Sequence, residues 1–194
     1  MFIIDIETEK TSQEANGWND PFSMGFGTAV VYCYDNDIYY FFNKNEKKKF
    51  KKLLKNEIVI SFNGIRFDNR VVEKNGNVTW KDIDLLEEVI RSKYKVDNIE
   101  EAVEIYGKNI VHNNTINLNG LSYGTLEKEK NGKGKLAPIL IQNKKWSKVF
   151  EYNLHDVRLT RQLFEYALQH GYVKDREGTI IYLNMYKIIE KVKQ

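Results

Sequence analysis

The feature that most constrains the fold of this chain is a near-continuous apolar run over residues 57–62, which ends in an Asn-Gly pair. A short run of this kind is typical of a strand buried on both faces, and such a strand requires helices on both sides of its sheet. Another short strand is expected at residues 3–7. Residues 28–34 and 38–42 are rich in β-branched and aromatic side chains, and an Asp-Asn-Asp turn between them predicts a hairpin.

Helical patterns follow these strands along the chain. Apolar residues three and four apart predict a helix over residues 46–56, and a further helix is expected to begin near Asp68. Residues 84–107 also look helical, with Asp84 as the cap, and residues 146–170 form the longest helical stripe, followed by Gly171. A last strand is expected over residues 179–183. The order of these elements predicts an α/β domain on a mixed sheet, with residues 1–194 forming a single domain.

Composition excludes several classes of protein. The chain has 194 residues, 30 Lys and Arg against 27 Asp and Glu, and a net charge of +3, a mildly basic balance that permits a nucleic-acid partner. Cys33 is the one cysteine, so neither a disulfide framework nor a cysteine zinc site is expected. No apolar stretch approaches the roughly 20 residues of a membrane span. We therefore expect a soluble, cytoplasmic protein.

Two acidic residues interrupt the first strand. Asp5 and Glu7 are two positions apart, so both carboxylates are expected on one face, while Ile4 and Ile6 point into the core. Carboxylates this close repel each other unless a cation lies between them, and Mg²⁺ and Mn²⁺ prefer oxygen ligands. The alternative interpretation is that one acid marks the end of the strand and the other is solvated.

Two further acids lie on predicted helices. Asp68 follows the motif Asn63-Gly64-Ile65-Arg66-Phe67, and Asp156 lies four residues after Tyr152, on the same helix face. Each has a structural alternative. Asp68 suits the first turn of a helix, and Tyr152 suits the core, with Asp156 on the helix surface.

Together these three segments resemble the exonuclease motifs of the DEDD (DnaQ-like) superfamily. They are Asp5-Ile6-Glu7-Thr8, Asn63-Gly64-x-x-Phe67-Asp68 and Tyr152-x-x-x-Asp156, and their order and spacing match as well. The tyrosine is similar to that of the tyrosine subclass, to which the proofreading domains of family B DNA polymerases belong. The resemblance extends from residue 2 to about residue 173, and residues 151–164 are also similar to predicted exonuclease domains associated with helicases.

This resemblance implies an RNase H-like fold with a mixed five-stranded sheet flanked by helices. It implies a 3′–5′ exonuclease that hydrolyses single-stranded DNA, with Asp5, Glu7, Asp68 and Asp156 holding two divalent cations, Mg²⁺ or Mn²⁺. Tyr152 is expected to orient the attacking water. Thr8, Asn63 and Phe67 are expected to contact the substrate, although Asn63 equally suits a turn and Phe67 the core.

The residues leave other functions open. An exoribonuclease on the same fold and a non-catalytic nucleic-acid-binding module both remain alternatives, and a helicase or polymerase is a candidate partner. The lysines Lys128, Lys130, Lys133 and Lys135 lie in a glycine-containing loop that suits contact with a nucleic-acid backbone. His155-Asp156 resembles a His-Asp hydrolase motif, but His112 and His170 are too few to complete that metal site.

Overall fold

The computed structural model describes residues 1–107, 110, 115–129 and 136–193, and each of its two compact units combines separate segments of the chain. The first unit comprises Met1–Asp82 with Asn131–Val157, and the second comprises Ile83–Lys130 with Arg158–Gln194. All the acidic residues singled out by the three motifs belong to the first unit.

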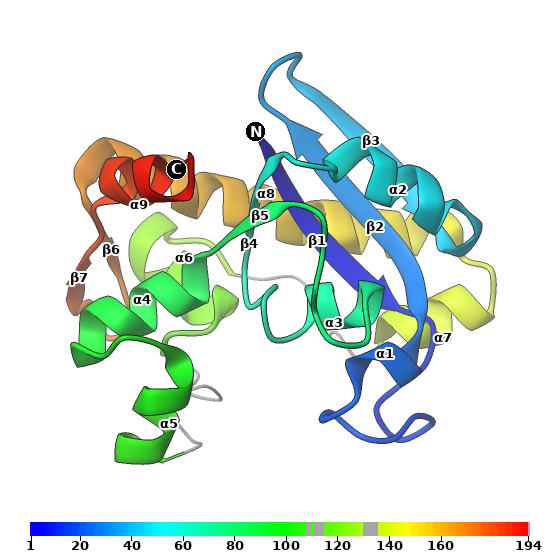
Figure 1. Cartoon of the computed structure of the whole chain (residues 1–194), viewed down its shortest axis with the longest axis horizontal. Helices are drawn as coiled ribbons and strands as arrows, with labels where there is room; N and C mark the ends of the chain where they lie inside the picture. Colours follow the sequence, from blue (N-terminus) through cyan, green and yellow to red (C-terminus); the bar gives the residue numbers. More distant parts are fainter. Residues whose placement is uncertain (108–109, 111–114, 130–135, 194) are drawn as a thin grey trace. The chain divides into compact units, whose positions relative to one another are not determined.

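A five-stranded mixed sheet organises the first unit (Figure 1). The strand order across it is β3-β2-β1-β4-β5, and β1 pairs antiparallel with β2 and parallel with β4. The parallel pair accounts for the apolar run predicted as a strand covered on both faces. The bounds of the strands are β1 Phe2–Thr8, β2 Phe26–Cys33, β3 Ile38–Asn43, β4 Ile58–Ser61 and β5 Lys81–Asp84.

One face of this sheet carries the main core of the unit. Phe2, Ile4 and Ile6 alternate along β1 and are buried on this face. They pack with Phe50 of α2 (Lys47–Leu54) and with Val71 of α3 (Asp68–Val72). The alternation of β1 therefore sends its odd-numbered residues, which include both acids, to the opposite face.

The opposite face is covered by α7 (Ala137–Gln142) and by the first turns of α8 (Trp146–His170). Ala137, Ile141 and Val149 form a small buried cluster between these two helices. Phe150 of α8 contacts Phe41 of β3 with ring centroids 5.5 Å apart. Helices on both faces complete an α/β architecture, as the sequence predicted.

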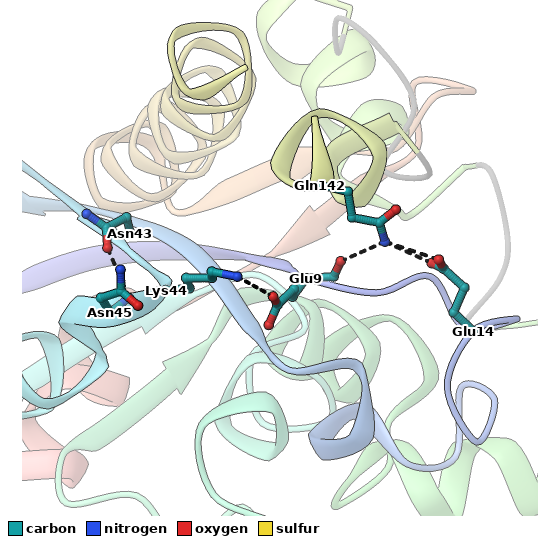
Figure 2. Close-up of polar contacts among 6 residues, drawn as sticks. All are labelled: Glu9, Glu14, Asn43, Lys44, Asn45 and Gln142. Carbon is teal, nitrogen blue, oxygen red and sulfur yellow. Dashed lines mark hydrogen bonds and ion pairs between the residues drawn. The ribbon is translucent and has the colours of Figure 1, made fainter. Parts of the chain in front are cut away.

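The remaining elements of the first unit are short and lie between strands. The helix α1 spans Pro21–Met24, and the 3-10 helix η1 spans Lys44–Glu46 ahead of α2. Asn43 caps η1 by accepting a hydrogen bond from the backbone N–H of Asn45 at 2.9 Å, as Figure 2 shows. Lys44, the first residue of η1, directly follows this cap.

The second unit contains the helical segment of α8 from Arg158 onward and a small two-stranded sheet. Lys93 forms a 2.7 Å ion pair with Asp175, whose side chain is fully buried. Gly124 lies against the backbone of Asp175 so closely that no Cβ fits there. The elements are α4 Leu85–Tyr94, α5 Ile99–Tyr106, α6 Leu118–Leu126, β6 Tyr172–Lys174, β7 Ile180–Tyr182 and α9 Met185–Lys193.

Most of the predicted elements are confirmed, and α8 has the predicted bounds of residues 146–170. Gly171 follows it at φ 75°, the left-handed conformation expected past a helix end. The helical pattern predicted over residues 84–107 is confirmed as two helices, α4 and α5, and α4 ends at Lys95, which adopts φ 59°. Among the described residues, no helix is long and apolar enough to cross a membrane.

Candidate metal centre

Three acidic side chains from distant parts of the sequence meet on the α7 and α8 side of the sheet. Asp5 and Glu7 come from β1, and Asp156 comes from α8. One carboxylate oxygen from each lies within 4.8 Å of the others. Asp156 is 1% exposed and Glu7 is 9% exposed, so this cluster is largely removed from water. These three residues could hold a metal ion.

The backbone of β1 explains why two of the acids share a face. Ile4 and Ile6 are 1% and 3% exposed in the core, which fixes the register of the strand and turns Asp5 and Glu7 to the other side. A one-residue slip would bury both carboxylates among apolar side chains. The alternative that one of these acids is simply solvated does not hold for Glu7, which is buried.

A bulge in β2 adjusts the end of β1 where Glu7 lies. Glu7 pairs with Thr28 and Thr8 pairs with Phe26, so Gly27 has no partner in the register. A Cβ at Gly27 would lie 2.8 Å from the carbonyl oxygen of Glu7 and 2.6 Å from the side chain of Ile141. Only glycine therefore allows this close approach of β2 to β1.

Asp68 lies beside the cluster but outside the group of three. Its Oδ1 accepts a 2.9 Å hydrogen bond from the backbone N–H of Ile6, the residue between Asp5 and Glu7. The pairing of β4 with β1 is registered at Phe2 and Ile3, so the far end of β1 extends past it. Asp68 satisfies a backbone donor there, and this contact places its buried carboxylate next to the two strand acids.

A polar network that the sequence did not reveal holds the turn before α3. Asp82 accepts hydrogen bonds from the Ser61 hydroxyl and from the Asn69 side-chain amide, both at 2.8 Å. A Cβ at Gly64 would overlap the Ser61 hydroxyl oxygen, so the turn requires glycine at that position. Burial raises the pKa of Asp82 to about 6, although these two hydrogen bonds oppose the shift.

Tyr152 lies one helical turn before Asp156 on α8. Its side chain is half-buried and packs against the cluster formed by Ala137, Ile141 and Val149. The ring is therefore part of the packing between α7 and α8, as the structural alternative for this residue required. Its position on the same helix face as Asp156 is also the position that the resemblance requires.

Of the three residues predicted to contact the substrate, two line a cavity and the third lies in a turn. Thr8 and Phe67 line a cavity of about 410 Å³ together with Glu7. Asn63 adopts φ 64° and its carbonyl accepts a hydrogen bond from the Phe67 N–H at 3.0 Å, so it acts as a turn residue. Asp84 caps α4 through backbone N–H groups of Leu86 and Glu87, which confirms that prediction.

The loop between β1 and α1 forms part of this cavity and is held by α7. Figure 2 shows the Gln142 amide donating to the carbonyl oxygen of Glu9 at 3.2 Å and to the Glu14 carboxylate at 3.1 Å. Lys44 binds the Glu9 carboxylate at 2.6 Å. Hydrogen bonds from the backbone and side chain of Thr11 hold the pKa of Glu14 below its usual range.

The predicted basic loop is described only in part. Lys128 donates a 3.0 Å hydrogen bond to Gln162 in the second unit. Lys130, Lys133 and Lys135 lie outside the described residues, as does His112. No protein-family model matches this chain, and no curated protein sequence matches it.

Proposed function

We propose that this chain is a divalent-metal-dependent 3′–5′ exonuclease with an RNase H-like fold, acting on single-stranded DNA. The observation that carries the proposal is the meeting of Asp5, Glu7 and Asp156, whose carboxylate oxygens lie within 4.8 Å of one another. Asp156 is 149 positions from Glu7 and 151 from Asp5, and these three acids belong to the first and third of the motifs.

The donor set fits Mg²⁺ or Mn²⁺. Every ligand offered by Asp5, Glu7 and Asp156 is a carboxylate oxygen, and hard divalent cations select such ligands. In this proposal Asp68, the first residue of α3, would supply a further carboxylate, since its Oδ1 already binds the Ile6 backbone between the two strand acids. When bound, the cations would activate water and neutralise charge on the scissile phosphate. Close packing of several acids in a buried site favours binding of a cation over a purely structural role.

The protein side chains have complementary roles in this proposal. Asp68 holds the end of β1 through Ile6, which keeps Asp5 and Glu7 aligned toward Asp156. The Tyr152 hydroxyl would orient the attacking water, and the packing of its ring against α7 restricts the positions of that hydroxyl. No covalent nucleophile is required, because water attacks the phosphorus and the 3′-oxygen leaves with a proton.

A cleavage assay tests this function. Single-stranded DNA and RNA labelled at the 5′ end would be incubated with the protein in Mn²⁺, Mg²⁺ or EDTA. The expected result is a ladder of products shortened from the 3′ end, absent in EDTA and reduced about 100-fold or more by Asp5→Asn. Asp35→Asn is the matched control, because the Asp35 side chain is 77% exposed and remote in sequence from the motifs.

The same assay separates the alternatives. Faster shortening of RNA than of DNA would favour an exoribonuclease, since the 2′-hydroxyl distinguishes the two substrates. Binding of either strand that persists in EDTA, with both substrates intact in Mn²⁺, would contradict the proposal and favour a non-catalytic binding module. A helicase or polymerase supplied by another chain is the proposed partner, and its addition is the next variable if the isolated protein is inactive.

A further inference from the structure

The cavity beside Glu7 is the strongest unexplained feature of the first unit. Its volume of about 410 Å³ is near the lower end of the range of roughly 300–1,000 Å³ that small-molecule sites occupy. Glu7 lines it and also belongs to the acidic cluster, so the cavity and the candidate metal centre are adjacent. Its lining also includes Thr11, Ser12, Trp18 and Phe67.

An exposed tryptophan stands in this lining. Trp18 is 62% exposed, although a large apolar ring at the surface has an unfavourable contact with water. Its ring contacts Phe67 with centroids 5.9 Å apart and planes at 45°, so one side is supported while much of the indole is accessible. An accessible aromatic ring next to a phosphodiesterase site is suited to stacking on a nucleobase.

Hydrogen bonds within the protein hold the walls of the cavity in position without a ligand. Gln142 of α7 binds Glu9 and Glu14, which lie on either side of the lining residues Thr11, Ser12 and Gln13 (Figure 2). The same helix contributes Pro138 and Ile139 to the lining. Because α7 both anchors the loop and supplies part of the wall, the cavity is formed before any ligand binds.

We propose that Trp18 is the platform on which the 3′-terminal base of the substrate stacks, so that the cavity accepts one unpaired nucleobase. This inference rests on the proposed exonuclease function. A terminal base that is still paired has its Watson–Crick edge occupied by its partner base, so that edge cannot reach the hydroxyls of Thr11 and Ser12 in the cavity lining. Stacking tolerates any base, whereas the hydroxyls of Thr11 and Ser12 contact the edge of whichever base is bound. Trp18 therefore determines specificity for single-stranded ends.

Fluorescence of 2-aminopurine tests this placement, because stacking on an aromatic ring quenches it. Oligonucleotides with 2-aminopurine at the 3′ end or at an internal position would be titrated with protein in Ca²⁺. We expect quenching at the 3′ end and not internally. Trp18→Ala is expected to abolish that quenching and to weaken binding about tenfold or more, whereas Trp18→Tyr retains both. Tyr186→Ala removes another aromatic residue, 68% exposed, and is the matched control.

The outcomes distinguish this inference from the proposed function. Suppose the wild type shortens DNA, but Trp18→Ala quenches the terminal 2-aminopurine and binds the oligonucleotide like the wild type. The assignment of Trp18 as the stacking platform is then wrong, and the proposed exonuclease activity is still supported. If the wild type quenches the terminal 2-aminopurine through Trp18 but does not cleave DNA in Mn²⁺, the proposed exonuclease activity is wrong and the cavity is a binding site for a nucleobase. Equal cleavage of paired and unpaired 3′ ends, or absence of terminal quenching, would overturn the inference.

Discussion

At the scale of single residues, the candidate site depends on polar side chains held in buried positions. Asp68 binds the Ile6 backbone at 2.9 Å, and Asp82 binds Ser61 and Asn69 at 2.8 Å. Buried polar groups stabilise a fold only when their hydrogen bonds are made. Asn69 directly follows Asp68, so the Asp82 network also restricts the turn that presents Asp68.

The raised pKa of Asp82 predicts a pH-dependent effect on stability. The folded pKa is about 6, against an ordinary value of 3.8. A raised pKa means that the stability from this group is fully present below about 3.8 and is lost as the pH rises through about 6. Asp82→Asn removes this dependence. Its side-chain oxygen can still accept from Ser61, and its NH2 group can donate to the Asn69 side-chain oxygen once the Asn69 amide rotates.

We therefore expect Asp82→Asn to gain stability relative to the wild type between pH 5 and pH 8, by about 1 kcal/mol, because the wild-type carboxylate ionises with a folded pKa of about 6 against 3.8 unfolded. Urea unfolding at both pH values measures the difference. Asp97→Asn, at an exposed position, is the control. A difference between variant and wild type that is the same at both pH values would contradict the raised pKa.

At the scale of elements, the alignment of β1 with β2 determines where the strand acids lie. Gly27 forms the bulge opposite Glu7 and Thr8, and a Cβ at this position would lie 2.8 Å from the Glu7 carbonyl oxygen and 2.9 Å from the Glu9 backbone nitrogen. The side chain of Ile141, on α7, closes the remaining space. The strand pair and α7 are thus in contact at the acid-bearing end of β1.

Gly27→Ala is expected to displace this end of β1. Because two of the nearest atoms belong to the backbone, the strain cannot be relieved by a side-chain rotation, and we expect a loss of about 1–3 kcal/mol in the free energy of unfolding. Nuclease activity is expected to fall with it, since Glu7 moves. Thr28→Val adds no heavy atom at the next position and is the control. Wild-type stability and activity in the Gly27→Ala variant would show that the close approach is unimportant.

At the scale of the whole chain, the helices and strands that could be predicted from the sequence are those with a clear local pattern of apolar residues. Apolar alternation predicted β1 and the β2–β3 hairpin, and the helical stripe predicted α8. It did not predict β5, a short strand whose residues Lys81 and Asp82 are polar. It also did not predict α6, where Gly120 and Gly124 weaken the helical pattern, although Gly124 allows close packing on Asp175.

The candidate site was predicted in part, for a similar reason. Asp5 and Glu7 share a face by strand periodicity alone, but their proximity to Asp156 depends on tertiary packing and was expected only through the resemblance. The cavity beside Trp18 depends on contacts of Gln142 with a loop about 130 residues away. No local pattern encodes a contact of that separation, so the loop could not be assigned a role from the sequence.

The measurement that tests the central claim most directly is Mn²⁺ binding in the absence of nucleic acid, followed by the electron paramagnetic resonance signal of free Mn²⁺. The account predicts that the wild type and Asp35→Asn remove Mn²⁺ from solution, while Asp5→Asn and Asp156→Asn bind about tenfold or more weakly and remain folded. Equal Mn²⁺ binding by all four folded proteins, or none by the wild type, would contradict the claim that these carboxylates form a metal centre.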